Sequence, residues 1–313
     1  MRFGVRLAVQ GEMGSPKASY EGARDMAVEA EQLGFDSVWI PDHVINAHMN
    51  VAMPMFDSWT LLSTLAVQTS KVRLAGHTFN NALRNPAVLA KMAATLDVIS
   101  GGRLIYSLGS AWFKREAESY GLPWDEHDDR VERLRESFLI ADALWTQEST
   151  TFNGRFCSLK DAVLEPKPRQ NPRIPFWVPG DSEATRALAA ELADVWLIYS
   201  KSPDVIREWG DEMTARRGGS ALPMALSTVS LVGLEQSDID LWSVKYAKER
   251  EHRFPVPPTP EDVLRENLWG PADDCIKRIK AYKEAGVEDV IIQPIPPLAG
   301  MRAFARDVMP AFS

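Results

Sequence analysis

The chain has 313 residues, 45% of them hydrophobic and 25% charged, and its formal net charge is −8 at pH 7. This length accommodates two ordinary domains or one large α/β barrel, and the composition is that of a globular protein, not a disordered or fibrous one. The negative charge, with no basic stripe interleaved with aromatics, argues against a nucleic-acid partner.

No segment has the character of a targeting signal or a membrane anchor. The apolar run at the N-terminus is broken by Arg6 and Gln10, and no apolar stretch approaches about 18 residues. We therefore expect neither a signal peptide nor a membrane span, and a cytoplasmic location. Cys157 and Cys275 lack the spacing of a disulfide framework or a zinc site, so we expect two reduced thiols and no bound metal.

A short unit recurs along the chain: a helical pattern ending in Gly or Ala, one or two polar residues, and then an apolar run. Each run is apolar on consecutive positions, which is typical of a strand buried on both faces of a parallel sheet. The predicted strands lie near residues 2–8, 36–41, 71–79, 103–109, 175–179, 194–199, 224–232 and 289–293. The predicted helices cover residues 18–33, 57–69, 86–99, 128–145, 183–192, 203–216, 272–285 and 300–311. Eight such units predict one α/β domain over residues 1–313, a (β/α)8 barrel rather than an open doubly wound sheet.

Two stretches interrupt this rhythm. Residues 151–168, "TFNGRFCSLKDAVLEPKP", carry Asn-Gly between strand-like flanks and predict a β-hairpin before the fifth strand. Residues 233–270 form a long, Pro-rich extended segment that contains Trp242, Tyr246 and Phe254. It is either a lid over a substrate or an insertion that only packs on the barrel.

The second strand ends on Pro41, Asp42 and His43, which are poorly suited to continuing a strand. In a (β/α)8 barrel the reactive groups lie where strands lead into the following loops at the C-terminal mouth. Asp42 and His43 are therefore candidate site residues, with His43 the stronger one. The alternative is a strand end with a capping carboxylate and a solvated imidazole.

The third and fourth strands end in polar residues at the same mouth. His77, Thr78 and Asn80 follow the third strand, where Asn80 is either a donor to ring carbonyls of a planar ligand or a turn residue with a locally satisfied amide. After the fourth strand, Gly109 permits close backbone approach and Ser110 either caps a helix or touches a ligand. No GxGxxG dinucleotide motif occurs in the chain.

The fifth strand leads through Gly180, Asp181 and Ser182 directly into a helix. The unpaired amides and positive dipole end of that helix suit a phosphate, although Asp181 opposes an anion unless its carboxylate points away. Alternatively, Asp181 or Ser182 is an ordinary helix N-cap, supported by Glu183, and no ligand is needed to account for these residues.

Several classes of catalysis lack their residues here. HExxH, GxSxG and Walker A motifs are absent, and Asp42 has no evident second carboxylate of the kind a glycosidase needs. A mouth lined by His43, His77, Asn80, Ser110 and apolar groups favours a planar cofactor that brings its own redox chemistry.

The sequence resembles the bacterial-luciferase-like oxidoreductases over most of its length. The matching stretches are "GFDSVWIPDHV", "NPAVLAKMAATLDVISGGRL" followed by "LGSAW", "FNGRFCSL" with "EPKP", "PFWVPG" and "AGVEDVII". The "LAKMAATLDVISGGRL" stretch is the most specific of these. Members of this family are (β/α)8 barrels that use coenzyme F420 or reduced FMN.

The resemblance implies roles for several residues. His43 would lie beside the reactive face of the cofactor ring, a non-proline cis peptide bond near His77 and Thr78 would bulge against that ring, and Gly180 to Ser182 would hold the cofactor phosphate. Two positions depart from the sugar-phosphate dehydrogenase branch, whose tryptophan and catalytic glutamate fall on Ala47 and Trp112. This departure argues against glucose 6-phosphate as the substrate.

We therefore expect hydride transfer to or from a small organic substrate with coenzyme F420, and His43 as acid or base, since imidazole titrates near neutral pH. The alternatives are a monooxygenase that uses reduced FMN and O2, and a non-catalytic ligand-binding barrel or partner subunit. Trp112, Trp242 and Phe254 are candidate contacts for an apolar or planar substrate. The resemblance also implies a homodimer through the second and third helices, although both helices could simply pack on the barrel.

Overall fold

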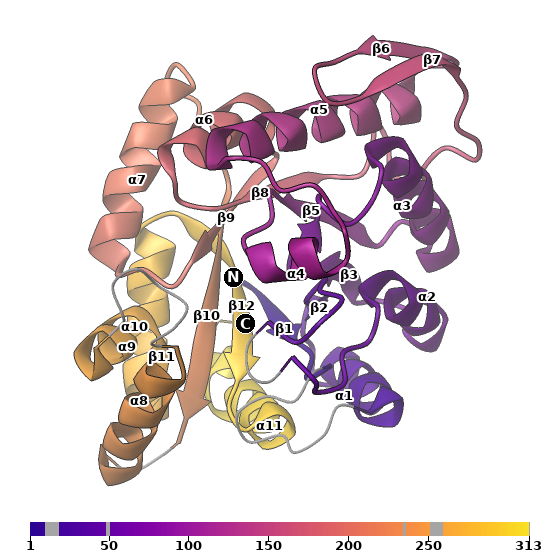
Figure 1. The fold of residues 1–313 in the computed structure, drawn as a ribbon. Coiled ribbons are helices and arrows are strands. Elements are labelled where there is room, and N and C mark those ends of the chain that lie inside the picture. Colours follow the sequence, from indigo (N-terminus) through magenta and orange to yellow (C-terminus); the bar gives the residue numbers. More distant parts are fainter. Residues whose placement is uncertain (10–18, 48–50, 234–235, 251–258, 313) are drawn as a thin grey trace.

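Eight parallel strands close into a barrel in the computed structural model, which describes residues 1–9, 19–47, 51–233, 236–250 and 259–312. The strands are β1 (Arg2–Arg6), β2 (Ser37–Ile40), β3 (Arg73–Gly76), β5 (Leu104–Gly109), β8 (Phe176–Pro179), β9 (Val195–Tyr199), β10 (Met224–Val232) and β12 (Val287–Pro294). The ring closes because β10 pairs with both β9 and β12, and β12 pairs with β1. The predicted (β/α)8 barrel is confirmed, and Figure 1 shows its helices around the strands.

The third strand is shorter than predicted. A continuous strand over 71–79 is wrong, because β3 ends at Gly76, the cis peptide bond His77–Thr78 follows, and a short β4 (Phe79–Asn80) pairs with β5. A Cβ on Gly76 would lie 2.4 Å from the Phe79 ring, so the chain folds back at a residue that has no side chain. The cis peptide bond lies where the family resemblance places it.

The helices that follow the barrel strands lie outside the ring (Figure 1). They are α1 (Tyr20–Gln32), α2 (Ser58–Gln68), α3 (Pro86–Ser100), α5 (His127–Thr146), α6 (Glu183–Leu192), α7 (Pro203–Arg216), α10 (Ala272–Glu284) and α11 (Pro297–Asp307), and a 3-10 turn, η1 (Met309–Phe312), ends the chain. Their starts follow local capping: Asp57 caps α2, and Asn85 caps α3 with proline as the next residue. None of the described helices is long and apolar enough to span a membrane.

The barrel interior is filled by side chains that point inward on alternate strand positions. Its middle consists of Trp39, Ala75, Ile105, Trp177, Val195, Leu197, Ala225 and Ile291. Gly4 makes room for this packing, because a Cβ there would lie 2.6 Å from Nε1 of Trp39. At the N-terminal end of the strands, Asp289 pairs with Arg2 and Arg73. The opposite end carries inward polar groups instead, and these form the floor of the site described below.

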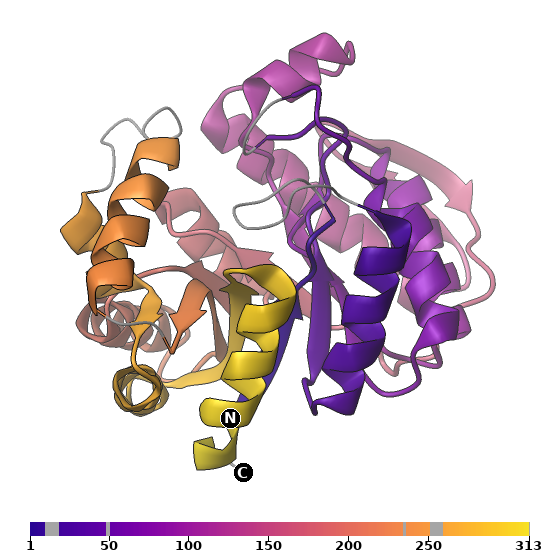
Figure 2. The same cartoon turned by 90° about the horizontal axis from the view of Figure 1, so that it is seen from below.

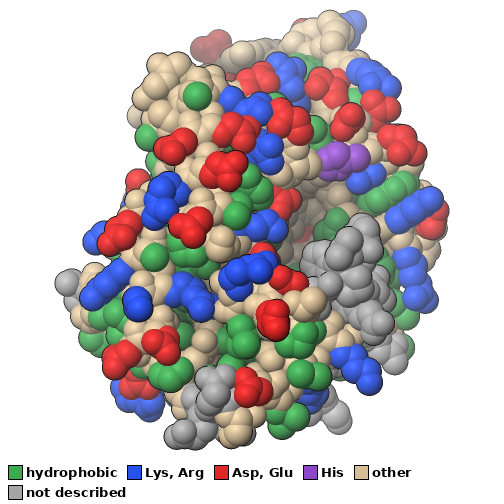
Figure 3. Space-filling view, turned by 90° about the vertical axis from the view of Figure 1, so that its left-hand side faces the viewer, with side chains coloured by type: hydrophobic (Ala, Val, Ile, Leu, Met, Phe, Trp, Pro, Cys, Tyr) green, Lys and Arg blue, Asp and Glu red, His purple; other side chains and the backbone are tan. Residues whose placement is uncertain are grey.

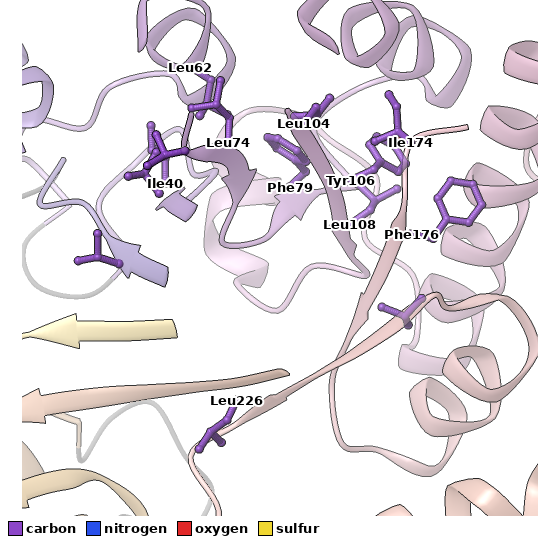
Figure 4. Close-up of a cluster of buried hydrophobic side chains, with 14 of the residues drawn as sticks. Ile40, Leu62, Leu74, Phe79, Leu104, Tyr106, Leu108, Ile174, Phe176 and Leu226 are labelled. Atoms are coloured by element: carbon purple, nitrogen blue, oxygen red, sulfur yellow. The ribbon is translucent and has the colours of Figure 1, made fainter. Parts of the chain in front are cut away.

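A larger apolar core lies between the strands and the helices. Figure 4 shows part of it, with side chains from β2, β3, β4, β5 and β8 together with Leu62 of α2. The "LAKMAATLDVISGGRL" stretch joins this layer to the barrel, since buried Asp97 accepts hydrogen bonds from the backbone N–H groups of Arg169 and Gln170 at 2.8 and 3.0 Å. Arg103 donates to the backbone carbonyls of Ala66 and Val72. The most specific stretch of the sequence therefore holds the fold and contributes no residue to the cavity.

The two insertions differ in how well they were predicted. β6 (Thr150–Asn153) and β7 (Ser158–Ala162) pair antiparallel, which confirms the predicted hairpin, although it begins one residue before the predicted range 151–168. The extended segment expected over 233–270 is instead built from α8 (Gln236–Arg250), α9 (Pro260–Glu266) and β11 (Leu268–Gly270). A helix after β5, α4 (Lys114–Ser119), was not predicted. Figure 2 shows the α4 region and α8 on the same side of the barrel.

Candidate functional site

A cavity of about 610 Å³ opens at the C-terminal ends of the strands, and all eight barrel strands or the residues directly after them contribute to its wall. Its floor is polar and is formed by side chains of four strands and of the residue directly after β3: Arg6, Tyr199, Ser227, Gln293 and His77. Figure 3 shows a hollow on one face of the molecule, with a histidine and both basic and acidic side chains at its rim. The cavity lies where the barrel architecture places reactive groups.

His43 lies in this cavity with a buried carboxylate behind it. Its Nδ1 is 3.0 Å from Oε2 of Glu116, which comes from α4 and is 1% exposed. The same carboxylate accepts hydrogen bonds from the Val44 backbone N–H at 2.7 Å and from the Asn80 amide at 3.2 Å. Since these neighbours donate, Glu116 acts as the acceptor, and the network assigns the imidazole proton to Nδ1.

Asp42 is held by groups of the protein itself. Its Oδ1 accepts a hydrogen bond from the Ser58 hydroxyl at 2.6 Å, and its Oδ2 accepts from the Asn80 backbone N–H at 2.9 Å. Arg84 forms an ion pair with it at 2.7 Å and reaches Asp57 at 2.8 Å. Asp42 therefore holds the chain at and after β4 in place through Asn80 and Arg84. It also lines the cavity.

His77 forms the centre of the floor. Its Nε2 is 2.7 Å from the Ser227 hydroxyl, and its ring stands at right angles to Trp39 and Tyr199. Burial, followed by the nearby Arg6 guanidinium, lowers the pKa of His77 from 6.5 to about 3, so this imidazole is neutral at working pH. Burial likewise raises the pKa of Tyr199 to about 12, which keeps its phenol protonated.

The wall beside His77 is shaped by backbone. The cis peptide bond His77–Thr78 lies next to Gly109, where a Cβ would be 2.6 Å from the Thr78 hydroxyl. Ser110 follows Gly109 and also lines the cavity. Asn80 lines it too, but its amide is engaged by Glu116 and by the Ala82 backbone N–H. Backbone and small side chains at Thr78, Gly109 and Ser110 therefore form this wall, against which a planar ring can pack.

The opposite end of the cavity is the N-terminus of α6. Gly180 has φ +114°, and a Cβ on it would lie 2.9 Å from the Thr185 hydroxyl. Ser182 caps the helix, and its hydroxyl also lies 2.9 Å from Nε2 of His127, the first residue of α5. The Asp181 carboxylate lies 3.4 Å from Nζ of Lys201, which offsets its charge. Helix amides, hydroxyls and His127 together suit a phosphate.

The three residues predicted to contact substrate have different positions. Trp112 lies at the cavity wall, 46% exposed, with its ring edge-to-face to His43 at 5.7 Å. Trp242 lies outside the described wall, because its indole packs on the small apolar cluster around Val229 and Trp269. From the same helix it is Tyr246 that lines the cavity. Phe254 lies outside the described residues.

Sequence reasoning missed Glu116, His127 and Arg6. Glu116 stands in the run "KREAE", which has the character of a solvated helix face, and nothing local marks one of its two glutamates as buried. Arg6 lies on a predicted strand and His127 lies directly before the predicted helix 128–145, and only the closed ring brings their side chains to the cavity. Among the described residues, no group of three or more His, Cys, Asp or Glu side chains is placed to hold a metal ion.

The pair of His43 and Glu116, the wall at Thr78 and Gly109 and the start of α6 open onto one cavity, an arrangement that suits an enzyme whose redox chemistry is supplied by a cofactor. Comparison with known proteins gives the family. Residues 1–243 match the family described as luciferase-like monooxygenase, and the chain belongs to this family.

The relatives include both deazaflavin and flavin enzymes. The F420-dependent glucose-6-phosphate dehydrogenase of Amycolatopsis mediterranei (strain U-32) is 28% identical, with 88% of this chain and 90% of that protein aligned. The FMNH(2)-dependent dimethylsulfone monooxygenase of Pseudomonas fluorescens (strain Pf0-1) is 34% identical, over 71% of this chain and 67% of that protein. An F420-dependent secondary alcohol dehydrogenase, solved with an F420-acetone adduct, has the same fold, with TM-score 0.82, 22% identity and coverage of 100% and 99% of the two chains.

Proposed function

We propose that this protein is a coenzyme F420-dependent oxidoreductase that transfers hydride to or from a small organic substrate, with His43 as the acid or base. The observation that carries the proposal is that His43, the cis peptide bond and the α6 N-terminus open onto one cavity. F420-dependent dehydrogenases among its relatives support the same cofactor.

The residues present fit such a cofactor. We propose that the wall at Thr78 and Gly109 receives the ring, and that Gly180, Ser182 and His127 receive the phosphate. Bound there, the deazaflavin would supply or accept the hydride. Ser110 follows Gly109 and lines the same cavity, so we propose that it contacts the cofactor as well. Asp42 and Asn80, which were predicted to bind cofactor, would instead support the wall through the hydrogen bonds described above.

The protein's own part in the chemistry is proton transfer. Glu116 holds the Nδ1 proton and orients the imidazole, so we propose that Nε2 of His43 exchanges the substrate proton. His77 would take no part in this exchange, because its lowered pKa makes the imidazole a weak base and its Nε2 is engaged by the Ser227 hydroxyl. Trp112 stands beside His43 and would shield the reacting atoms from water.

The second candidate is a monooxygenase that uses reduced FMN and O2. Two relatives, 36% and 34% identical over 42% and 71% of this chain, are FMNH(2)-dependent dimethylsulfone monooxygenases. The ring wall and phosphate site proposed here would serve either cofactor. Glucose 6-phosphate is not our proposed substrate, because Ala47 and Trp112 stand where the sugar-phosphate enzymes have their tryptophan and glutamate.

Cofactor titration separates these candidates. We expect the purified protein to quench F420 fluorescence at micromolar concentrations or below. With alcohols as hydride donors it should bleach F420 absorbance, and with aldehydes and ketones as hydride acceptors it should restore the absorbance of reduced F420. His43→Ala should bind F420 normally and bleach it at least 100-fold more slowly. FMN binding with O2 consumption, and no F420 binding, would favour the monooxygenase. Absence of turnover with every substrate of the panel, together with unchanged ligand affinity in His43→Ala, would leave only a ligand-binding barrel.

We also propose a homodimer through α2 and α3, in the cytoplasm. Val67, Val88, Val98 and Ile99 of these helices are between 41% and 68% exposed, which is unusual for large apolar side chains. Both cysteines are free, as a reducing compartment would keep them. Light scattering should give twice the chain mass of 34.9 kDa, and Val67→Glu with Ile99→Glu should halve the measured mass.

A further inference from the structure

One side of the cavity has no part in the chemistry proposed so far. The cofactor ring is assigned to Thr78 and Gly109, beside the ends of β3 and β5, and in the closed ring of eight strands β10 and β12 lie opposite this pair. The cavity is lined on that opposite side by the distal wall, which consists of Val229, Tyr246 and Val263. A ring packed at Thr78 therefore turns its other face toward the distal wall.

The distal wall is apolar and firmly packed. Val229 of β10, Tyr246 of α8 and Val263 of α9 are only 5%, 6% and 2% exposed, yet all three line the cavity. They belong to one apolar cluster with Trp269, whose ring stands edge-to-face to that of Tyr246 at 5.2 Å. Three elements thus bring apolar groups to one place, and a ligand that packs against them gains affinity by burying apolar surface.

Asn267, which lies between α9 and β11 and is 5% exposed, ties the distal wall to the barrel. Its Oδ1 accepts hydrogen bonds from the Ser200 hydroxyl at 2.9 Å and from the Val229 backbone N–H at 3.2 Å. Its Nδ2 donates to the Val263 carbonyl at 2.9 Å. Because both ends of the amide are engaged, its orientation is fixed, and it holds α9 against the ends of β9 and β10.

The charged groups that line this side of the cavity are paired. Asp262 and Glu266 lie 2.6 and 3.5 Å from Arg265, and Lys201 lies 3.4 Å from Asp181. Among the described residues, this side therefore offers no unpaired cation to a phosphate or a carboxylate. An uncharged substrate suits such a surface, since an anion would lose its hydration there without gaining a partner.

We propose that the distal wall receives the apolar body of an uncharged alcohol or ketone, and that Asn267 is the positioning residue that holds this wall in place. The inference rests on the proposed function, because it takes the cofactor ring to lie at Thr78 and Gly109. The substrate then lies between the ring and the distal wall. His43, which follows β2 next to β3, borders the same space.

The first test compares three ligands on the protein loaded with oxidised F420, which cannot reduce a ketone. Ligand-detected NMR titration gives the dissociation constants of cyclohexanone, acetone and cyclohexanecarboxylate. We expect cyclohexanone to bind at least tenfold more tightly than acetone, which is three carbons smaller, and than the carboxylate, which is charged. Val263→Thr keeps the shape of the wall but adds a hydroxyl, so it should weaken cyclohexanone binding at least threefold and change acetone binding less than twofold.

The second test separates the two ends of the Asn267 amide. Asn267→Asp keeps the acceptor that faces the barrel and loses the donor to Val263, so it should release α9 alone. We expect about tenfold weaker binding of cyclohexanone, faster amide hydrogen exchange over residues 260–266, and F420 affinity within about twofold of wild type. In cyclohexanol oxidation KM should rise about tenfold with kcat unchanged. Glu261→Gln, on the exposed face of the same helix, is the matched control and should behave as wild type.

Each outcome decides a separate claim. Equal binding of cyclohexanone and acetone, or tightest binding of the carboxylate, would overturn the substrate class, while binding of F420 would still support the proposed function. Wild-type binding and hydrogen exchange in Asn267→Asp would overturn the positioning role. Loss of folding in that variant would also overturn it, because Asn267 would then serve the whole fold, and Val263→Thr would test the wall. If F420 does not bind, the proposed function fails, and the same titrations on the cofactor-free protein test the distal wall by themselves.

Discussion

The most specific prediction concerns Glu116, because its buried carboxylate determines which ring nitrogen of His43 carries the proton. In Glu116→Gln the amide oxygen keeps the Val44 N–H, while the amide nitrogen faces Nδ1 of His43 at the present 3.0 Å separation. A donor at that position requires an acceptor, so the imidazole must move its proton to Nε2. The variant therefore inverts the tautomer while it preserves the hydrogen bond.

The expected magnitudes differ for folding and for turnover. Exchange of a charge-assisted bond for a neutral one should lower the free energy of unfolding by about 1–2 kcal/mol. Turnover should fall about 10²- to 10⁴-fold, since a wrongly protonated imidazole cannot accept the substrate proton. F420 affinity should change by less than about threefold, because Glu116 is not among the residues assigned to the cofactor.

The tautomer of His43 can be determined by NMR in the absence of substrate. Long-range ¹H–¹⁵N spectra at pH 8 distinguish protonated from bare ring nitrogens, and His43→Ala assigns the signal among five histidines. Glu118→Gln, two residues further along α4, is the matched control because its carboxylate is exposed and pairs with Lys114 on the surface of the same helix. If His43 in Glu116→Gln kept its proton on Nδ1, or turned over substrate like Glu118→Gln, the assignment of Glu116 would be refuted.

Three further predictions concern the support of the site. Arg84→Met leaves the buried carboxylate of Asp42 without its ion pair and should lower the free energy of unfolding by about 3–5 kcal/mol in urea denaturation; a change below about 1 kcal/mol would contradict the role given to Asp42. Because the pKa of His77 is about 3 in the folded chain and 6.5 ordinarily, the unfolded chain takes up a proton between these values and the folded chain does not. Stability should therefore be full above about pH 6.5 and fall as the pH drops toward 3, and thermal denaturation of His77→Gln should show a flatter profile in that window. Gly109→Ala would place a methyl 2.6 Å from the Thr78 hydroxyl and should weaken F420 binding at least tenfold in fluorescence titration, whereas unchanged affinity would place the ring elsewhere.

The architecture was predictable because each barrel strand is buried on both faces, which leaves consecutive apolar residues as its signature. Runs such as "SVWI" in β2 and "VWLIY" in β9 show this directly. The break after Gly76 was not visible, since the apolar Phe79 continues the strand pattern while its ring folds back over the glycine. Helix α8 was not predicted, because the prolines near the end of its segment indicated an extended chain.

The site residues were predictable only where they follow a barrel strand. His43, His77 and Ser182 follow strands directly, so the barrel rule alone places them at one mouth. Glu116 lies in α4, the helix that follows β5. Its contacts with His43 and Asn80 are between residues far apart in the sequence, so no local pattern predicts its burial. Trp242 was predicted to contact substrate, but the sequence does not show which side of its helix faces the cavity. In the structure its indole packs on the small apolar cluster around Val229 and Trp269.

A crystal structure of the protein with F420 bound is the most direct test of the account. We predict the deazaflavin ring against the Thr78–Gly109 wall with His43 beside its reactive carbon, and the phosphate on the first amides of α6 at Ser182. A ring or phosphate bound away from either group, with His43 out of reach of the cofactor, would contradict the claim that one cavity unites them.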